Sequence, residues 1–244
     1  MNNDLLAGVG LTRLTVYHQR AAPDGILSGC AHVHACTDEG YYAVSGSGAI
    51  ELNDMQNGFR SVPLNPGDYV QFPPQTLHRS VSHGDLVVLV LMGNAGLAEH
   101  GDARMYFGAA VDADPVEYAR LVALPRHHGL EGALERRDAS VRAYMRLMDW
   151  WQTDRPAYFT ELKRFLALHQ ATLAPRRAEF ARIIDDGPGR WLADARQAVE
   201  NLGVTHPDTS TTSTAHAVRT TPPDATQALG MCGLLEQFLT SKPA

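Results

Sequence analysis

Short hydrophobic runs, rich in β-branched and aromatic residues, alternate with turn residues over the first 111 positions of the chain. Glycine, proline, asparagine and aspartate separate the runs, as in SGSG at 45–48 and NPGD at 65–68. Many short strands at near-regular spacing, with no helical pattern between them, predict a β-sandwich or a β-barrel. The predicted strands are residues 11–19, 30–35, 40–44, 48–52, 60–64, 69–72, 78–81 and 86–92.

The pattern changes at residue 112, beyond which large hydrophobic residues recur every three or four positions. Asp114, Pro115 and Glu117 predict a helix start: aspartate is the N-cap, proline takes the first helical position, and glutamate completes a capping box. Four or five amphipathic helices are predicted over residues 112–204, packed on the barrel through stripes that include Trp151, Phe165 and Trp191. Breaks between them are expected at Pro125, Pro156, Pro175 and the turn at 186–189.

Two further segments follow. Residues 205–226 are rich in threonine, serine, proline and aspartate, which predicts a linker or a long surface loop. Residues 227–244 are predicted to hold a C-terminal helix, because Leu229, Leu234 and Leu235 supply an apolar side. The predicted fold class is therefore α+β overall, with a β-rich region at 1–111 followed by an all-α region.

The charge and composition exclude several classes of partner. The chain of 244 residues is 44% hydrophobic, and its net charge of −6 argues against nucleic acid or an anionic membrane surface as a partner. Residues 112–244 hold 16 Lys and Arg against 17 Asp and Glu, which leaves no basic recognition helix. The first residues lack a secretory signal, and three cysteines without framework spacing favour a reducing compartment, so a cytoplasmic location is expected.

Four potential metal ligands fall within the β-rich region. His32 and His34 alternate on one predicted strand, so both side chains project to the same side of it. Glu39 follows after a short turn, and His78 lies on a later strand. Three imidazoles and a carboxylate suit Fe(II), Mn(II), Ni(II), Cu(II) or Zn(II), and they leave coordination positions open for a substrate.

The spacing of these residues resembles the first motif of the cupin superfamily. That motif runs glycine, five residues, His-x-His, three or four residues, glutamate, six residues, glycine. This chain has His32 and His34, four residues, Glu39, six residues and Gly46. Its leading Gly25 lies one position further upstream than the pattern asks.

The second cupin motif is also matched, with two substitutions. The family pattern is glycine, five residues, Pro-x-Gly, two residues, histidine, three residues, asparagine. In this chain Gln75 replaces the usual glycine before His78, and Ser82 replaces the usual asparagine. The resemblance covers roughly the first 110 residues. It implies a jelly-roll barrel with a metal ion in its mouth, a small-molecule substrate and a homodimer.

Four other residues are candidates for chemistry or substrate binding. Tyr41 shares the strand parity of Glu39, so its phenol is a candidate proton carrier or, alternatively, a pocket wall. Ser80 and Ser82 share the parity of His78 and are candidates for substrate binding, or else they face water. Arg13 on the first predicted strand could clamp an anionic substrate group or remain solvated.

The motifs leave three interpretations of function open, because one fold and one ligand set support many reactions. The first is an Fe(II) dioxygenase acting on a small organic molecule, which the apolar and aromatic setting favours. The second is a non-redox isomerase, epimerase or lyase in which Mn, Ni, Zn or Cu could also serve as a Lewis acid. The third is a cupin that senses a small molecule and catalyses nothing.

Overall fold

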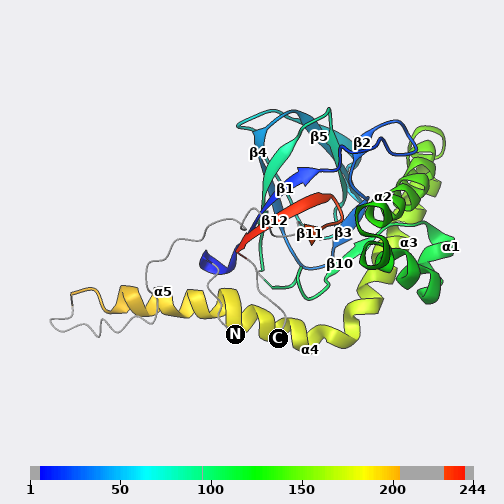
Figure 1. Ribbon diagram of the computed structural model, residues 1–244. Helices are drawn as coiled ribbons and strands as arrows, with labels where there is room; N and C mark the ends of the chain where they lie inside the picture. Colours follow the sequence, from blue (N-terminus) through cyan, green and yellow to red (C-terminus); the bar gives the residue numbers. More distant parts are fainter. Residues whose placement is uncertain (1–5, 95, 204–227, 240–244) are drawn as a thin grey trace.

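Two antiparallel sheets form the β-rich part of the molecule (Figure 1). The computed structural model describes residues 6–94, 96–203 and 228–239, and the side chains of this range up to residue 237. The first sheet has the strand order β11 (Ala228–Leu229), β12 (Gly233–Leu239), β1 (Gly10–Val16), β9 (Val87–Met92), β4 (Glu39–Ser45) and β7 (Tyr69–Phe72). The second has the order β10 (Ala103–Met105), β3 (His32–His34), β8 (Leu77–Ser82), β5 (Gly48–Asp54) and β6 (Gly58–Leu64), and β2 (Leu27–Ser28) pairs with β8.

A hydrophobic core fills the space between the two sheets. The first sheet contributes Leu14, Tyr41 and Val88, and the second contributes Ile50 and Leu52, all of them almost fully buried. Alternate residues of each strand face this interior, as the sequence pattern requires. The predicted β-rich region followed by helices, α+β overall, is confirmed.

The C-terminal segment is a β-hairpin, so the helix predicted within residues 227–244 is wrong. Strands β11 and β12 pair with each other, and β12 pairs along β1 with Leu235 opposite Leu14. A bare β1 edge would expose unpaired backbone groups, and β12 satisfies them. Gly233 permits the close approach, because a Cβ there would lie 2.0 Å from the carbonyl oxygen of Thr15. The predicted linker at 205–226 lies outside the described residues.

The helices follow the barrel strands, and their start is the predicted one. The described chain begins with a short 3-10 turn, η1 (Leu6–Gly8), ahead of the barrel strands. The barrel is followed by α1 (Ala109–Asp112), α2 (Pro115–Thr153) and α3 (Arg155–Leu173). The Asp114 carboxylate caps α2 by accepting hydrogen bonds from the backbone N–H groups of Val116 and Glu117. The expected break at Pro125 does not occur, since α2 continues to a local break at Gly129. Among the described helices, none is long and apolar enough to cross a membrane.

Helices α2 and α3 pack on the second sheet (Figure 1). Val33 and Leu77 of that sheet share one hydrophobic cluster with Tyr144 and Leu147 of α2 and Phe165 of α3. Buried polar contacts fix the same interface, including hydrogen bonds of the Asn53 side chain with the hydroxyls of Tyr144 and Tyr158. The face of β3 opposite to His32 and His34 is therefore held by the helical layer.

The last helices depart from the prediction that the whole region 112–204 packs on the barrel. The short helix η2 (Ala174–Arg176) leads into α4 (Arg177–Ile184), η3 (Asp185–Gly189) and α5 (Arg190–Glu200), which extends away from the barrel (Figure 1). Phe180 and Ile183 of α4 pack against Leu97. Helix α5 has no buried residue, and Trp191 is 47% exposed, so its apolar stripe is not used for packing within the described chain.

Candidate metal centre

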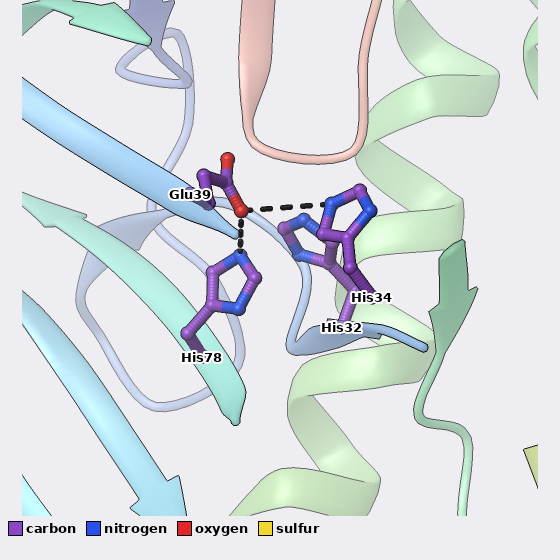
Figure 2. A group of neighbouring side chains, drawn as sticks. All are labelled: His32, His34, Glu39 and His78. Atoms are coloured by element: carbon purple, nitrogen blue, oxygen red, sulfur yellow. Dashed lines mark ion pairs between the residues drawn. The ribbon is translucent and has the colours of Figure 1, made fainter. Parts of the chain in front are cut away.

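The four predicted ligands meet at one point inside the barrel (Figure 2). His32 and His34 come from β3, Glu39 opens β4, and His78 lies on β8 directly opposite His32. One donor atom of each residue lies within 4.8 Å of the others. All four side chains are buried, with residue exposures of 5% or less. Strand alternation on β3 and the β3–β8 register therefore bring together residues far apart in the chain.

The carboxylate of Glu39 lies between two imidazoles. Its Oε2 atom is 3.1 Å from Nε2 of His78 and 3.5 Å from Nε2 of His34, the contacts drawn as dashed lines in Figure 2. Despite this proximity, Glu39 Oε2 and His78 Nε2 make no hydrogen bond within the described part of the chain. Buried polar atoms without hydrogen-bond partners cost free energy, so these two atoms indicate that a bound ligand or ion completes their bonding.

The second nitrogen of each histidine is held by an acceptor. Nδ1 of His32 lies 3.2 Å from the Cys30 carbonyl oxygen, and Nδ1 of His78 lies 3.0 Å from the Thr76 carbonyl oxygen. Nδ1 of His34 lies 2.7 Å from Oδ1 of Asp102. A carbonyl oxygen only accepts, so Nδ1 of His32 and of His78 must donate, and the ionised Asp102 imposes the same role on His34. This arrangement turns all three Nε2 lone pairs toward the cluster, as metal-binding histidines require.

The electrostatics suit a cation at this point. Burial raises the pKa of Glu39, but the imidazoles of His78, His34 and His32 outweigh burial and hold the pKa of that carboxyl at about 2. Burial lowers the pKa of His32 well below its ordinary value, helped by the neighbouring His78 and His34. The cluster therefore offers an ionised carboxylate and at least one imidazole that stays neutral, both of which are forms that bind a metal.

Asp102 is a buried residue of the candidate site that the sequence pattern missed. It precedes β10, is fully buried, and besides His34 it binds the backbone N–H of Cys36 at 3.3 Å and of Thr37 at 3.0 Å. The Thr37 hydroxyl donates a further hydrogen bond to it at 2.7 Å. Burial raises the pKa of Asp102, but these bonds, above all the one from His34, outweigh burial and leave it lowered. No local spacing links it to the other ligands, so only the folded chain identifies it.

The donor set fits a divalent metal ion. Three imidazole nitrogens and one carboxylate oxygen converge, two of the buried donor atoms lack partners, and the Nδ1 atoms are fixed by hydrogen bonds. Such mixed nitrogen and oxygen ligands accept several first-row metals, so the ligands alone do not choose among iron, manganese, nickel, zinc and copper. The cluster could thus hold a metal ion of this group.

A small pocket opens beside the cluster. Its volume is about 180 Å³, below the roughly 300–1,000 Å³ of pockets that hold drug-sized molecules. The C-terminal hairpin supplies a large share of the wall, and the chain around residues 98–99 supplies another. The lining residues are Thr12, Leu14, His34, Glu39, Tyr41, Val90, Met92, Ala98, Glu99, Met231, Cys232, Leu235 and Gln237.

Tyr41 and Ser80 lie in this interior, as strand parity predicts. The Tyr41 hydroxyl is 3.8 Å from Sγ of Cys232, and its ring lies edge-on to His78. Burial raises the pKa of Tyr41 well above its ordinary value, and Cys232 and Glu39 add to the effect. Ser80 is fully buried and close enough to lower the pKa of both Tyr41 and Cys232. Their expected roles as proton carrier and substrate ligand stay predictions.

Two of the other predicted substrate contacts are engaged elsewhere. Arg13 lies between the pocket-lining Thr12 and Leu14, so it faces the opposite side of β1, where its guanidinium pairs with Glu236 at 2.7 Å. The hydroxyl of Ser82 accepts hydrogen bonds at 3.1 Å from the backbone N–H groups of Gly84 and Leu86. Arg13 as an anion clamp is therefore a wrong expectation, and Ser82 instead stabilises the turn after β8.

Part of the barrel matches a known family of domains. Residues 17–92 match the sequence model of the family described as a cupin domain. The matched residues run from the end of β1 to the end of β9, so this part of the chain is a cupin domain. The resemblance expected from the two motifs is confirmed.

The glucose-6-phosphate isomerase of Thermococcus onnurineus (strain NA1) is 41% identical over 56 residues. The match covers 22% of this chain and 30% of that enzyme. The glucose-6-phosphate isomerase of Pyrococcus horikoshii is 39% identical over the same length, again 30% of its own chain. The similarity thus spans less than a third of either curated relative.

Two solved structures illustrate the likeness of the barrel. PAC13 from Streptomyces, solved with uridine, is 21% identical with a TM-score of 0.31, over 42% of this chain and 70% of that one. A double-stranded β-helix protein from Klebsiella pneumoniae is 18% identical with a TM-score of 0.30, over 41% and 76% of the two chains. Identities and TM-scores this low say nothing about the activity of this chain.

Proposed function

We propose that this cupin is a metal-dependent, non-redox enzyme that moves a proton beside the carbonyl group of a small uncharged hydroxy-carbonyl compound, as an isomerase or epimerase does. The observation that carries the proposal is the pocket, in which a buried three-histidine, one-glutamate cluster shares walls with further ionisable groups. That combination is what proton-transfer chemistry needs: a site for a metal, a sheltered volume and side chains that exchange protons.

His32, His34, Glu39 and His78 are the residues that would hold the metal. When bound there, a divalent ion would act as a Lewis acid toward a substrate oxygen. Strands β1 and β9 and the C-terminal hairpin would enclose the substrate and exclude water. Thr12 and Gln237 would offer polar groups to its hydroxyls. Exclusion of water strengthens each of these polar interactions.

The charge of the pocket selects against phosphorylated substrates. Among the described residues, no lysine or arginine lines the pocket, whereas Glu39 and Glu99 do. A phosphate group in such a setting would meet carboxylates without a cationic partner, which is unfavourable. Arg13, the strand-borne cation nearest in sequence to the lining residues, is turned to the other face and paired. An uncharged substrate is therefore the better fit.

The sulfur atoms in the wall favour non-redox chemistry over oxygen activation. Met92, Met231 and Cys232 all line the pocket, and Cys232 Sγ lies 3.7 Å from Nδ1 of His32. Thioethers and thiols are readily oxidised, so an iron centre that activates dioxygen would place its own walls at risk. A site built for Lewis-acid chemistry carries no such hazard.

The short similarity to two glucose-6-phosphate isomerases supports the reaction class, since those proteins are named as sugar isomerases. It does not extend to the substrate, because the aligned part is 30% of each relative and the pocket here has no cationic lining among the described residues. The class of reaction and the charge of the substrate are thus supported by different observations.

An Fe(II) dioxygenase is the second candidate, and the apolar lining favours it. Leu14, Val90, Met92 and Leu235 would suit a hydrophobic organic substrate. The two candidates differ in whether oxygen is consumed and in which protons exchange with solvent.

One experiment separates these possibilities. The purified protein is analysed for metal, loaded with Mn(II), Zn(II), Ni(II) or Fe(II), and incubated in D₂O with unphosphorylated aldoses and ketoses of three to six carbons. Deuterium incorporation at carbon without oxygen uptake supports the proposal. Oxygen uptake dependent on Fe(II) and on an apolar substrate contradicts it in favour of the dioxygenase. Metal binding with neither activity contradicts it in favour of a sensor.

A further inference from the structure

Glu99 is an ionisable residue in the pocket that neither the cupin motifs nor the metal cluster accounts for. It lies on the turn between β9 and β10, and it shares the pocket lining with His34 and Glu39. The turn is anchored because Leu97, fully buried, packs in one hydrophobic cluster with Phe180 and Ile183 of α4. The helical region thereby fixes the position of a carboxyl group beside the candidate metal centre.

One oxygen of Glu99 has no partner in the described chain. Its Oε2 atom is buried and makes no hydrogen bond. A buried carboxyl oxygen without a partner costs free energy, so its retention in a pocket is explained best by a ligand that completes its bonding. The same pocket is the volume in which a substrate would contact the metal cluster.

The other proton carriers of the pocket are poorly suited to take a proton. The Tyr41 phenol is fully buried, and burial raises its pKa well above the ordinary value, so it does not ionise near neutral pH. Glu39 is committed to the ligand cluster, since its Oε2 atom lies 3.1 Å from Nε2 of His78 and 3.5 Å from Nε2 of His34. Burial raises the pKa of Glu99, against the pull of the Gly96 and Glu99 backbone N–H groups and of His100.

The two carboxyl groups of this pocket thus differ in their surroundings: Glu39 lies among the histidines, whereas one oxygen of Glu99 has no partner in the described chain. Environments of this kind separate the roles of paired carboxyl groups in enzymes: one stays ionised as a ligand and the other exchanges protons. Glu39 takes the first role by its position among the histidines. Glu99 is left with the second.

We propose that Glu99 is the catalytic residue that carries the proton between carbon atoms of an uncharged α-hydroxy-carbonyl substrate. This inference rests on the proposed function and names the group that performs its central step. The ionised carboxylate takes the proton from the carbon that bears the hydroxyl group, and the electron pair of that C–H bond forms a carbon–carbon double bond. The carbonyl electron pair moves onto its oxygen, which gives an enediolate.

The protonated Glu99 then returns its proton. Delivery to the original carbon re-forms the substrate, and delivery to the former carbonyl carbon, with the hydroxyl proton passing to the other oxygen, gives the isomer. In each case one C–H bond breaks and one forms, and the composition of the substrate is unchanged. No oxidant or second substrate is required.

The test measures solvent exchange and metal binding in parallel. Wild-type protein, Glu99→Gln and Glu99→Asp are loaded with Mn(II) and incubated in D₂O with unphosphorylated trioses to hexoses, and deuterium at carbon is followed by NMR. General acid–base groups contribute roughly 10²–10⁴-fold, so Glu99→Gln is expected to lose at least about 100-fold in exchange rate. Glu99→Asp keeps the carboxyl group and is expected to retain part of the rate. Metal content is expected to be equal in all three.

A matched control removes a carboxylate outside the pocket. Glu179→Gln alters a partly exposed residue of α4 whose carboxylate pairs with Arg176, and this variant is expected to show the wild-type rate of deuterium exchange. Wild-type exchange rates in a folded, metal-loaded Glu99→Gln would overturn the role of Glu99 and leave the proposed function standing. Absence of exchange by the wild-type protein on every sugar would overturn the proposed function, and this inference with it.

Discussion

Asp102 accepts a hydrogen bond at 2.7 Å from Nδ1 of His34, although 68 positions separate the two residues in the chain. Asp102 also binds the backbone of Cys36 and Thr37, so one carboxylate fixes both the imidazole and the turn that leads to Glu39. Its own backbone carbonyl lies 2.6 Å from Nε2 of His169 on α3. The group of four candidate ligands is therefore connected to the helical layer through Asp102.

Asp102→Asn tests this support. The amide keeps the shape but loses the charge, so the bond that orients His34 weakens, and metal affinity is expected to fall by roughly 10–100-fold. Isothermal titration with Zn(II) or Mn(II) measures the change. Asp149→Asn, at an exposed position near the C-terminal end of α2, is the control and is expected to bind the metal with wild-type affinity. Equal affinity in both variants would show that Asp102 holds only the turn.

Gln75 occupies a position that suits glycine. Its φ angle is +65°, in the left-handed region, and its backbone N–H donates to the carbonyl oxygen of His34 at 2.8 Å. The turn before His78 is thus preserved despite the substitution in the cupin motif, at a cost in backbone strain. Gln75→Gly is expected to raise the free energy of unfolding by about 1 kcal/mol. Chemical denaturation measures it, and Gln75→Ala, which keeps a Cβ, is expected to gain nothing; equal gains in both variants would refute the strain argument.

The candidate ligands and the barrel could be predicted from the sequence because both depend on local patterns. His32 and His34 alternate on one strand, and short hydrophobic runs between turns mark the sheet. Asp102 and Glu99 were missed because their places at the candidate site arise from contacts distant in sequence. Arg13 was misjudged because alternation does not say which face of a strand is inside, and the burial of its neighbours decides it. The expected homodimer stays a prediction.

The C-terminal hairpin shows another limit. Leu229, Leu234 and Leu235 fit a short helix or a strand equally well, and the choice depends on pairing with β1 at the other end of the chain. Gly230 and Gly233 carry a local hint, since glycine is poor in a helix and allows close backbone approach in a sheet.

Gly233→Ala tests how firmly the hairpin closes the barrel. The added Cβ would lie 2.0 Å from the Thr15 carbonyl oxygen, so β12 must shift, and the variant is expected to lose roughly 2 kcal/mol or more of stability. Gly93→Ala, where the nearest atom is 3.3 Å away, is the control and is expected to lose much less. Thermal and chemical unfolding compare the two. A Gly233→Ala protein as stable as the control would mean that β12 is not tightly docked.

His169 predicts a pH dependence of stability. Burial lowers its pKa to about 4 from an ordinary 6.5, so between those values the unfolded chain binds a proton that the folded chain does not. Stability is therefore expected to fall as the pH drops from about 6.5 toward 4, by an amount that approaches about 3 kcal/mol.

His169→Gln removes this titration. Its stability relative to wild type is expected to improve steadily as the pH is lowered through that window, which denaturation at a series of pH values measures. A difference between the two proteins that is constant from pH 7 to pH 4 would contradict the assignment.

His32, His34, Glu39 and His78 form a buried group that could hold a divalent metal ion, and the account of the site depends on this binding. The most direct measurement is the metal content of the protein as purified and after loading, compared with Glu39→Gln and His78→Ala, with circular dichroism to check the fold. The wild-type chain is expected to bind close to one equivalent, and both variants are expected to lose most of the metal while the barrel stays folded. No metal in the loaded wild-type protein, or undiminished metal in both variants, would contradict it.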